Sequence, residues 1–146
     1  MNPNTSDHSS APWRFEQDGE ACSLYQPTLL RNADSDLWND RMTVTTDQFA
    51  QTRGRVLTPN PQTYSEEGRL LYLQSPGWSE SLRFPAGAHA YPEGSFRYTV
   101  TPACAQWEYT DKAFTASLQL ALPRTMPGEC WEFTATNHSD RKLPLV

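Results

Sequence analysis

The chain has 146 residues, of which 37% are hydrophobic and 20% charged, and it carries a formal net charge of -5 at neutral pH. Such a chain is long enough for one domain with a buried core, and its hydrophobic share argues against general disorder. No basic stripe runs along the sequence, and phosphate-backbone binding needs clustered Lys and Arg, so the composition argues against a nucleic-acid partner.

Residues 1–12 are polar, with neither a basic start nor an apolar run, so they predict a disordered tail and no signal peptide. No stretch reaches the roughly 18 apolar residues of a membrane helix, so no membrane association is expected. The cysteines have no CxxC spacing, which disfavours a disulfide framework or a zinc site; they are Cys22, Cys104 and Cys130. These signals predict reduced thiols and a cytoplasmic location.

Residues 13–146 predict one domain of short strands. The expected strands are 21–25, the second half of 37–46, 95–101, 106–110, 114–122 and 130–136. Residues 69–74 are a short apolar run, whereas 58–68 is rich in turn residues and poor in strand formers. The clearest is 114–122, where apolar and polar side chains alternate. No segment predicts a helix of ten or more residues. The pattern indicates an all-β fold, an antiparallel β-sandwich.

The last part of the chain, from Glu129 to Val146, predicts a strand, a polar turn and the first residues of another strand. A strand that lacks its hairpin partner keeps an unpaired edge. We therefore expect the sandwich to be incomplete in this chain, which would be the front of a larger protein.

Few residues have a pattern that supports catalysis. No partner at metal-ligand spacing accompanies the histidines His8, His89 and His138, so no metal site is expected. The motifs GxSxG, GxxxxGK[ST] and GxGxxG are absent from the sequence. Carboxylates cluster around Trp38, at Asp34, Asp36 and Asp40. Paired carboxylates beside an aromatic ring can carry out glycosidic chemistry, although a loop with several Asp residues more often forms solvated turns.

Three stretches together carry a family resemblance. They are LWNDRM at 37–42, FRYTVTP at 96–102 followed by WEYT at 107–110, and the segment 114–146, which contains an LP break and then ECWEFTATNHSDR. The chain resembles, over about residues 22–146, the N-terminal region of the cellobiose-phosphorylase-like enzymes, which are inverting glycoside phosphorylases. The third stretch is the most specific, and none of the three is a catalytic motif.

This resemblance implies a galactose-mutarotase-like sandwich (a supersandwich), followed in the family by a helical linker and a catalytic α/α barrel. There, a general-acid Asp protonates the glycosidic oxygen and inorganic phosphate, the co-substrate, attacks the anomeric carbon from the opposite face. No residue of this chain matches the barrel motif, so no catalytic residue is assigned. The resemblance implies a non-catalytic sandwich without a cofactor of its own, which serves an oligosaccharide or β-glucoside through the full-length enzyme. It also implies contacts with the barrel and with a second copy in a homodimer.

The candidate sugar contacts are Trp38, Asn39 and Arg41, because Trp offers a stacking face and Arg a bidentate donor. The competing interpretation makes Trp38 a core anchor and Arg41 a surface residue.

Two other hypotheses for the whole chain remain open. It could be a stand-alone carbohydrate-binding module that uses exposed aromatic side chains, or an inert remnant of a truncated gene, whose open core and exposed edge would favour aggregation.

Overall fold

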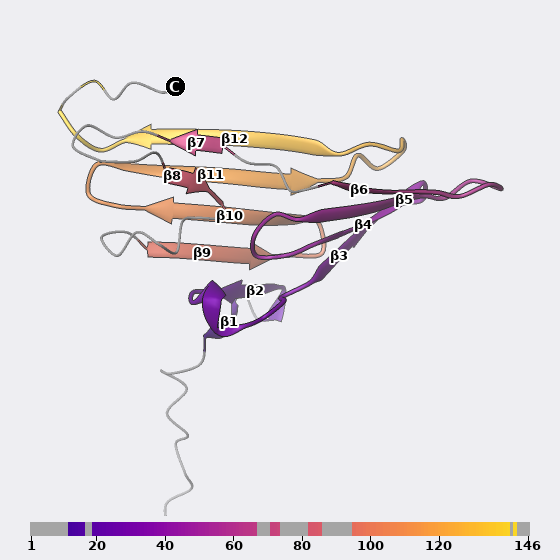
Figure 1. Cartoon of the computed structure of the whole chain (residues 1–146), viewed down its shortest axis with the longest axis horizontal. Helices are drawn as coiled ribbons and strands as arrows, with labels where there is room; N and C mark the ends of the chain where they lie inside the picture. The colour runs from indigo at the N-terminus through magenta and orange to yellow at the C-terminus, as the bar shows by residue number, and fades with distance from the viewer. Residues whose placement is uncertain are drawn as a thin grey trace, which may run out of the picture.

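A computed structural model describes residues 12–16, 19–66, 71–73, 82–85, 95–140 and 142. The described residues form an all-β fold of antiparallel sheets that pack as a sandwich (Figure 1). The largest sheet has six strands in the order β1-β2-β9-β10-β11-β12. These strands are β1 (Trp13–Glu16), β2 (Ala21–Leu24), β9 (Ser95–Val100), β10 (Cys104–Thr110), β11 (Phe114–Ala121) and β12 (Cys130–Asn137).

Two smaller sheets complete the described structure. A four-stranded sheet has the order β3-β4-β5-β6, and a two-stranded sheet pairs β7 with β8. Their strands are β3 (Ser35–Trp38), β4 (Met42–Thr46), β5 (Thr52–Val56), β6 (Gln62–Glu66), β7 (Leu71–Leu73) and β8 (Leu82–Phe84). A single-turn 3₁₀ helix at Pro27–Leu29 is the one helical element in the described ranges, which agrees with the expectation of no long helix.

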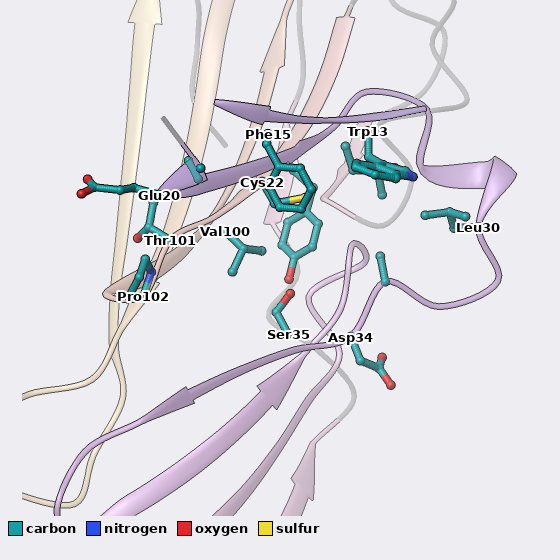
Figure 2. Close-up of a pocket in the computed structure, with 15 residues that line it drawn as sticks. Trp13, Phe15, Glu20, Cys22, Leu30, Asp34, Ser35, Val100, Thr101 and Pro102 are labelled. Carbon is teal, nitrogen blue, oxygen red and sulfur yellow. The ribbon is translucent and has the colours of Figure 1, made fainter. Parts of the chain in front are cut away.

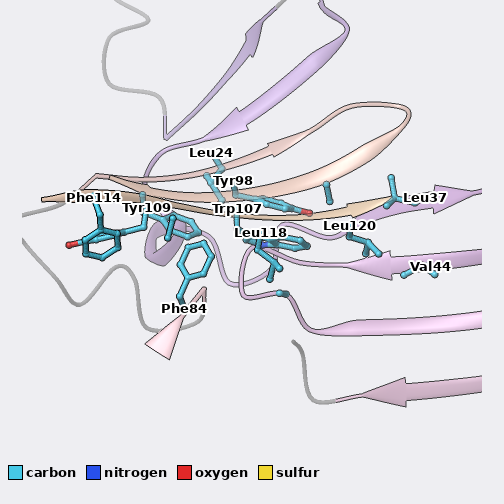
Figure 3. Packing of buried hydrophobic residues seen from close by; sticks show 14 of the residues in the cluster. Leu24, Leu37, Val44, Phe84, Tyr98, Trp107, Tyr109, Phe114, Leu118 and Leu120 are labelled. Atoms are coloured by element: carbon cyan, nitrogen blue, oxygen red, sulfur yellow. The ribbon is translucent and has the colours of Figure 1, made fainter. Parts of the chain in front are cut away.

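The core forms on one face of the six-stranded sheet because its strands alternate apolar and polar residues. In β10 and β11 every second residue is buried. Trp107 is fully buried and stacks on Tyr98 and Trp131, with ring centroids 5.4 and 5.7 Å apart. Leu118 lies opposite Trp107 on the neighbouring strand and adds to the same layer. Figure 3 shows Tyr98, Trp107 and Leu118 in this layer.

The smaller sheets supply the other wall of the core. Leu37, Val44 and Phe84 are buried and belong to the same cluster as Trp107 (Figure 3). One hydrogen bond also ties the sheets together: the Trp107 indole Nε1 donates to the backbone oxygen of Asp47, at 3.0 Å. The expected sandwich is therefore confirmed, with its core between the six-stranded sheet and the smaller sheets.

The opposite face of the six-stranded sheet is polar, as the alternation predicts. Arg97 and Glu108 form a cross-strand ion pair at 2.8 Å, and the hydroxyls of Thr110 and Thr115 lie 3.1 Å apart. A polar cavity of about 300 Å³ lies on this face, between β10, β11 and β12. We interpret this face as the solvated side of an antiparallel sheet.

Most of the expected strands are confirmed within a few residues, but one prediction is wrong. Residues 58–68, predicted to be poor in strand, contain β6 at Gln62–Glu66. Among the described strands, β6 pairs with β5 alone. An edge strand is held by backbone hydrogen bonds on one side and needs no apolar alternation to form, so its polar sequence gave no signal. The sequence also predicted no strand at β1, β3, β5 or β8, each of which has between three and five residues.

The predictions for the two ends of the chain fall mainly outside the described residues. Residues 1–11 and 143–146 lie outside the described residues. Pro12 is described, and its backbone oxygen accepts a hydrogen bond from the Tyr25 backbone N–H at 2.8 Å. The ordered structure therefore includes Pro12.

Candidate functional site

Asn39, one of the predicted sugar contacts, stabilises the turn between β3 and β4. Its Oδ1 accepts hydrogen bonds from the backbone N–H groups of Arg41 and Met42, at 2.7 and 2.8 Å. Its Nδ2 donates to the backbone oxygens of Pro123 and Met126 in the loop between β11 and β12. Both ends of the amide are thus engaged, as in an Asx turn. Asn39 therefore has a structural role: its amide links the β3–β4 hairpin to the loop between β11 and β12.

Trp38 lies on the outside of β3 and is 67% exposed. The interpretation of Trp38 as a core anchor is therefore wrong, because Leu37 takes the inward position on this strand and is buried. Arg41 is exposed in the turn, as the surface interpretation expected. None of the three predicted contacts lines the polar cavity on the six-stranded sheet, and none lines the larger cavity at the other end of that sheet.

A larger cavity of about 440 Å³ lies at the other end of the six-stranded sheet (Figure 2). We call it the Trp13 cleft. Strands β1, β2 and β9 and the segment leading into β3 form its walls. The residues that line it include Trp13, Phe15, Leu24, Leu30, Ala33, Ser35, Tyr98 and Val100.

Trp13 and Phe15 form the aromatic wall of the Trp13 cleft. They share one face of β1 because they are two residues apart on a strand, and their partners across the pair are Leu24 and Cys22. The two rings meet edge to face, with centroids 5.3 Å apart. Their exposed fractions are 43% and 67%. An edge strand with two large aromatic side chains turned toward a cavity is a typical surface for ligand contact.

Tyr98 places a buried hydroxyl in the lining of the cleft. Its side chain is 2% exposed and its phenol oxygen is buried, so this oxygen offers no open surface to the cleft. The Ser35 hydroxyl lies beside it and, through a hydrogen bond, acts to lower the pKa of Tyr98; in Figure 2 it points from β3 toward β1 and β2. Burial raises the pKa of Tyr98 far above its ordinary value, so the phenol stays neutral and able to donate. Buried polar groups in proteins are nearly always paired, and the Ser35 hydroxyl is the neighbour that serves Tyr98.

A buried amide fixes the wall opposite Trp13. Gln48 is fully buried; its Nε2 donates to the Leu30 backbone oxygen at 3.0 Å, and its Oε1 accepts from the Ala33 backbone N–H at 2.8 Å. The segment from Leu30 to Ala33 has few backbone hydrogen bonds of its own. The Gln48 side chain therefore holds this wall in place before any ligand arrives.

The edge strand β1 is fastened at its end by Tyr25. The Tyr25 hydroxyl donates to the Glu16 carboxylate, which is the main reason that the pKa of Glu16 is lowered. The Arg14 guanidinium lies over the Tyr25 ring, 5.6 Å from its centroid.

Cys22 also lines the cleft, and burial raises the pKa of its thiol. A thiol with a raised pKa is a poor nucleophile, so Cys22 contributes to packing.

The predicted carboxylate cluster does not form a paired site. Asp34 lines the Trp13 cleft, Asp36 accepts a hydrogen bond from the Thr45 hydroxyl at 2.6 Å, and Asp40 is exposed in the β3–β4 turn. Within the described ranges, no three side chains of His, Cys, Asp or Glu are grouped to hold a metal ion. Of the histidines, only His138 lies in these ranges, where its Nε2 is 2.8 Å from the Thr115 hydroxyl.

The Trp13 cleft was missed in the sequence because its residues come from four separate places in the chain. Trp13 and Phe15 indicated only the start of the ordered region, and Tyr98 was read as one residue of an alternating strand. The one local signal is the alternation of Trp13 and Phe15 before a polar turn. Ser35 and Leu30 gave no signal, since their positions depend on Gln48 and on the pairing of β3.

No protein-family model matches the chain, and no curated protein matches it. In the part of the chain that is described, no helix has the length and apolar character to cross a membrane. The Trp13 cleft and the motifs in the sequence are the features of this chain that point to a function.

Proposed function

We propose that this chain is a non-catalytic, carbohydrate-binding β-sandwich, the N-terminal part of a glycoside-phosphorylase-like protein, and that the Trp13 cleft holds a sugar-containing ligand. One observation carries the proposal: two exposed aromatic side chains, Trp13 and Phe15, wall a cavity of about 440 Å³. The motifs at 37–42, 96–102 and 114–146 support the choice of family.

Aromatic side chains suit sugars because the faces of a pyranose ring carry C–H groups. Such a face stacks on an indole or phenyl ring, while hydroxyls at the ring edge take hydrogen bonds. Trp13 is half exposed, so part of its ring surface is open to solvent. A cavity of about 440 Å³ lies within the roughly 300–1,000 Å³ of small-molecule sites. The Trp13 cleft thus combines a stacking surface with room for a ligand.

The same cleft is not arranged for glycosidic chemistry. Phosphorolysis with inversion needs a general acid at the glycosidic oxygen and phosphate on the opposite face of the sugar. The carboxylates that line the cleft, Glu20 and Asp34, lie at its two ends, with their side chains directed away from it (Figure 2). In this proposal the sandwich binds ligand and contacts a barrel and a second copy, and the barrel carries out the reaction with inorganic phosphate. The three free cysteines fit a reducing compartment such as the cytoplasm.

A stand-alone carbohydrate-binding module would use the Trp13 cleft in the same way. The inert-remnant hypothesis has less support, because the described residues pack a continuous core around the fully buried Trp107.

Binding of cellobiose and longer β-glucosides, measured by calorimetry and by Trp fluorescence, tests the proposal. We expect Trp13→Ala to weaken binding by about tenfold or more, because an aromatic side chain that is covered by a ligand contributes about 1.5–3 kcal/mol. Trp38→Ala is the matched control, since Trp38 is equally an exposed tryptophan on a strand but lies outside the cleft. Equal affinity of Trp13→Ala and the unaltered chain would contradict the proposal.

A further inference from the structure

We infer that the turn between β4 and β5 is a pH-sensitive latch, in which ionisation of the buried Asp47 loosens the hold of Gln48 on the segment from Leu30 to Ala33. This segment forms one wall of the Trp13 cleft, so the latch sets how rigid that wall is. The inference concerns the folded chain without a ligand and stands apart from the proposed function.

The turn at residues 47–51 contacts both sides of the sandwich. The Asp47 backbone oxygen accepts a hydrogen bond from the Trp107 indole Nε1, which belongs to the six-stranded sheet. The fully buried Gln48 amide bonds at one end to the Leu30 backbone oxygen and at the other to the Ala33 backbone N–H. Any change in how this turn is seated therefore reaches the segment that leads into β3.

Asp47 brings a charge into this buried turn. It is 6% exposed, and its Oδ1 accepts hydrogen bonds from the backbone N–H groups of Phe49 and Gln51. Among the described residues, no cation forms an ion pair with it. A buried charge without a counter-charge is relieved by protonation or by exposure to water. Ionised Asp47 therefore favours an opened turn, and neutral Asp47 favours the closed one.

The titratable groups that face Asp47 add to this effect. They are Asp34, in the segment next to Ala33, and Tyr98 on β9, whereas Trp107 on β10 does not titrate. The charge of Asp34 raises the pKa of Asp47, and the Tyr98 phenol is neutral. Asp34 and Asp47 thus carry like charges on the two parts that Gln48 joins. Ionisation of Asp47 adds repulsion across this contact.

The direction of the pH effect follows from the raised pKa of Asp47. Such a group stabilises the closed state fully below its ordinary pKa of about 3.9, and this stability is lost as the pH rises through the raised pKa. The latch should be tightest near pH 4 and looser at neutral pH. The Ala33 N–H reports its state directly, because its acceptor is the Gln48 Oε1, at 2.8 Å.

Hydrogen exchange of the full chain, followed by NMR between pH 4 and 7 and corrected for intrinsic exchange, tests the inference. We expect the protection factor of the Ala33 N–H to fall by at least about threefold over this range, and that of the Trp107 indole N–H to fall with it. The Leu57 N–H is the internal control. It donates to the Arg41 backbone oxygen at 2.7 Å, beyond the opposite end of β5, and its protection should stay constant.

Three variants identify the group responsible. Asp47→Asn keeps an oxygen for the two backbone donors and should make the protection of Ala33 independent of pH. Asp34→Asn should make the fall smaller, because it removes the like charge. Asp36→Asn is the matched control: its carboxylate is exposed on β3, and the fall should remain in full.

Each contrary outcome overturns a defined part of the inference. Constant protection of Ala33 in the unaltered chain would show that the charge of Asp47 does not reach the segment, and would overturn the latch. The same holds for a fall that persists undiminished in Asp47→Asn, since another group would then cause it. An equal fall at Leu57 and Ala33 would mean that the protein opens as a whole, which overturns a local latch. An undiminished fall in Asp34→Asn overturns the part assigned to repulsion.

Discussion

Asp47 is a buried carboxylate whose pKa is changed by its surroundings. Its carboxylate is buried, and Oδ1 accepts hydrogen bonds from the backbone N–H groups of Phe49 and Gln51, at 2.8 and 2.9 Å. Burial raises the pKa of Asp47 in spite of these bonds, and the charge of Asp34 adds to the rise. The folded protein therefore binds the proton of Asp47 more readily than the unfolded chain does.

This pKa shift gives a pH prediction with a defined sign. A raised pKa in the folded state contributes stability that is fully present below the unfolded pKa of about 3.9 and is lost as the pH rises through the folded pKa. Asp47→Asn keeps an oxygen for the two backbone donors and removes the buried charge. We expect this variant to have a higher urea midpoint than the unaltered chain at neutral pH, with the difference shrinking toward pH 4.

Urea titrations at several pH values measure the effect. Asp36→Asn serves as the control, because Asp36 is exposed on β3. A neutral-pH midpoint that falls in Asp47→Asn would contradict the assignment of burial as the dominant cause.

At the scale of elements, the β3–β4 hairpin depends on the side chain of Asn39. This amide closes the turn through Arg41 and Met42 and also reaches the loop before β12 through Pro123 and Met126. It therefore links the edge of the four-stranded sheet to a connection of the six-stranded sheet. Removing a side chain that hydrogen-bonds to two elements should lower the free energy of unfolding more than removing one that bonds only within its own turn.

Asn39→Ala is expected to lower the free energy of unfolding by about 1–3 kcal/mol, because it leaves backbone donors and acceptors of two elements unpaired. Chemical denaturation measures this change. The control is Arg41→Ala in the same turn, which is exposed and should change stability by no more than about 0.5 kcal/mol. Similar stabilities for the two variants would show that the turn forms without the amide.

At the scale of the whole molecule, Trp107 connects the two sides of the sandwich. Its ring stacks on those of Tyr98 and Trp131, and its Nε1 donates across the core to the Asp47 backbone oxygen. Trp107→Phe would lose this hydrogen bond and leave a cavity. We expect thermal and denaturant unfolding to show a loss of about 2–4 kcal/mol, whereas Trp38→Phe on the outside of β3 should change little. Equal effects of the two changes would mean that the sheets are held together elsewhere.

The sequence alone determined the fold class and the strands that bury one face. Segments such as 95–101 and 114–122 alternate apolar and polar residues, and a strand with one buried face must do so. Edge strands carry no such requirement, so β6 escaped detection.

Only the tertiary structure decided which way Trp38 faces, since Leu37 and not its neighbour takes the inward place in β3. It also decided the pairing of β2 with β9, which is distant in the chain and leaves no local trace in the sequence. That pairing places Tyr98 on the far side of β2 from β1 and next to Ser35, and so contributes to the Trp13 cleft. The physical reason is that alternation is a property of one strand, whereas a cleft is made by contacts between strands.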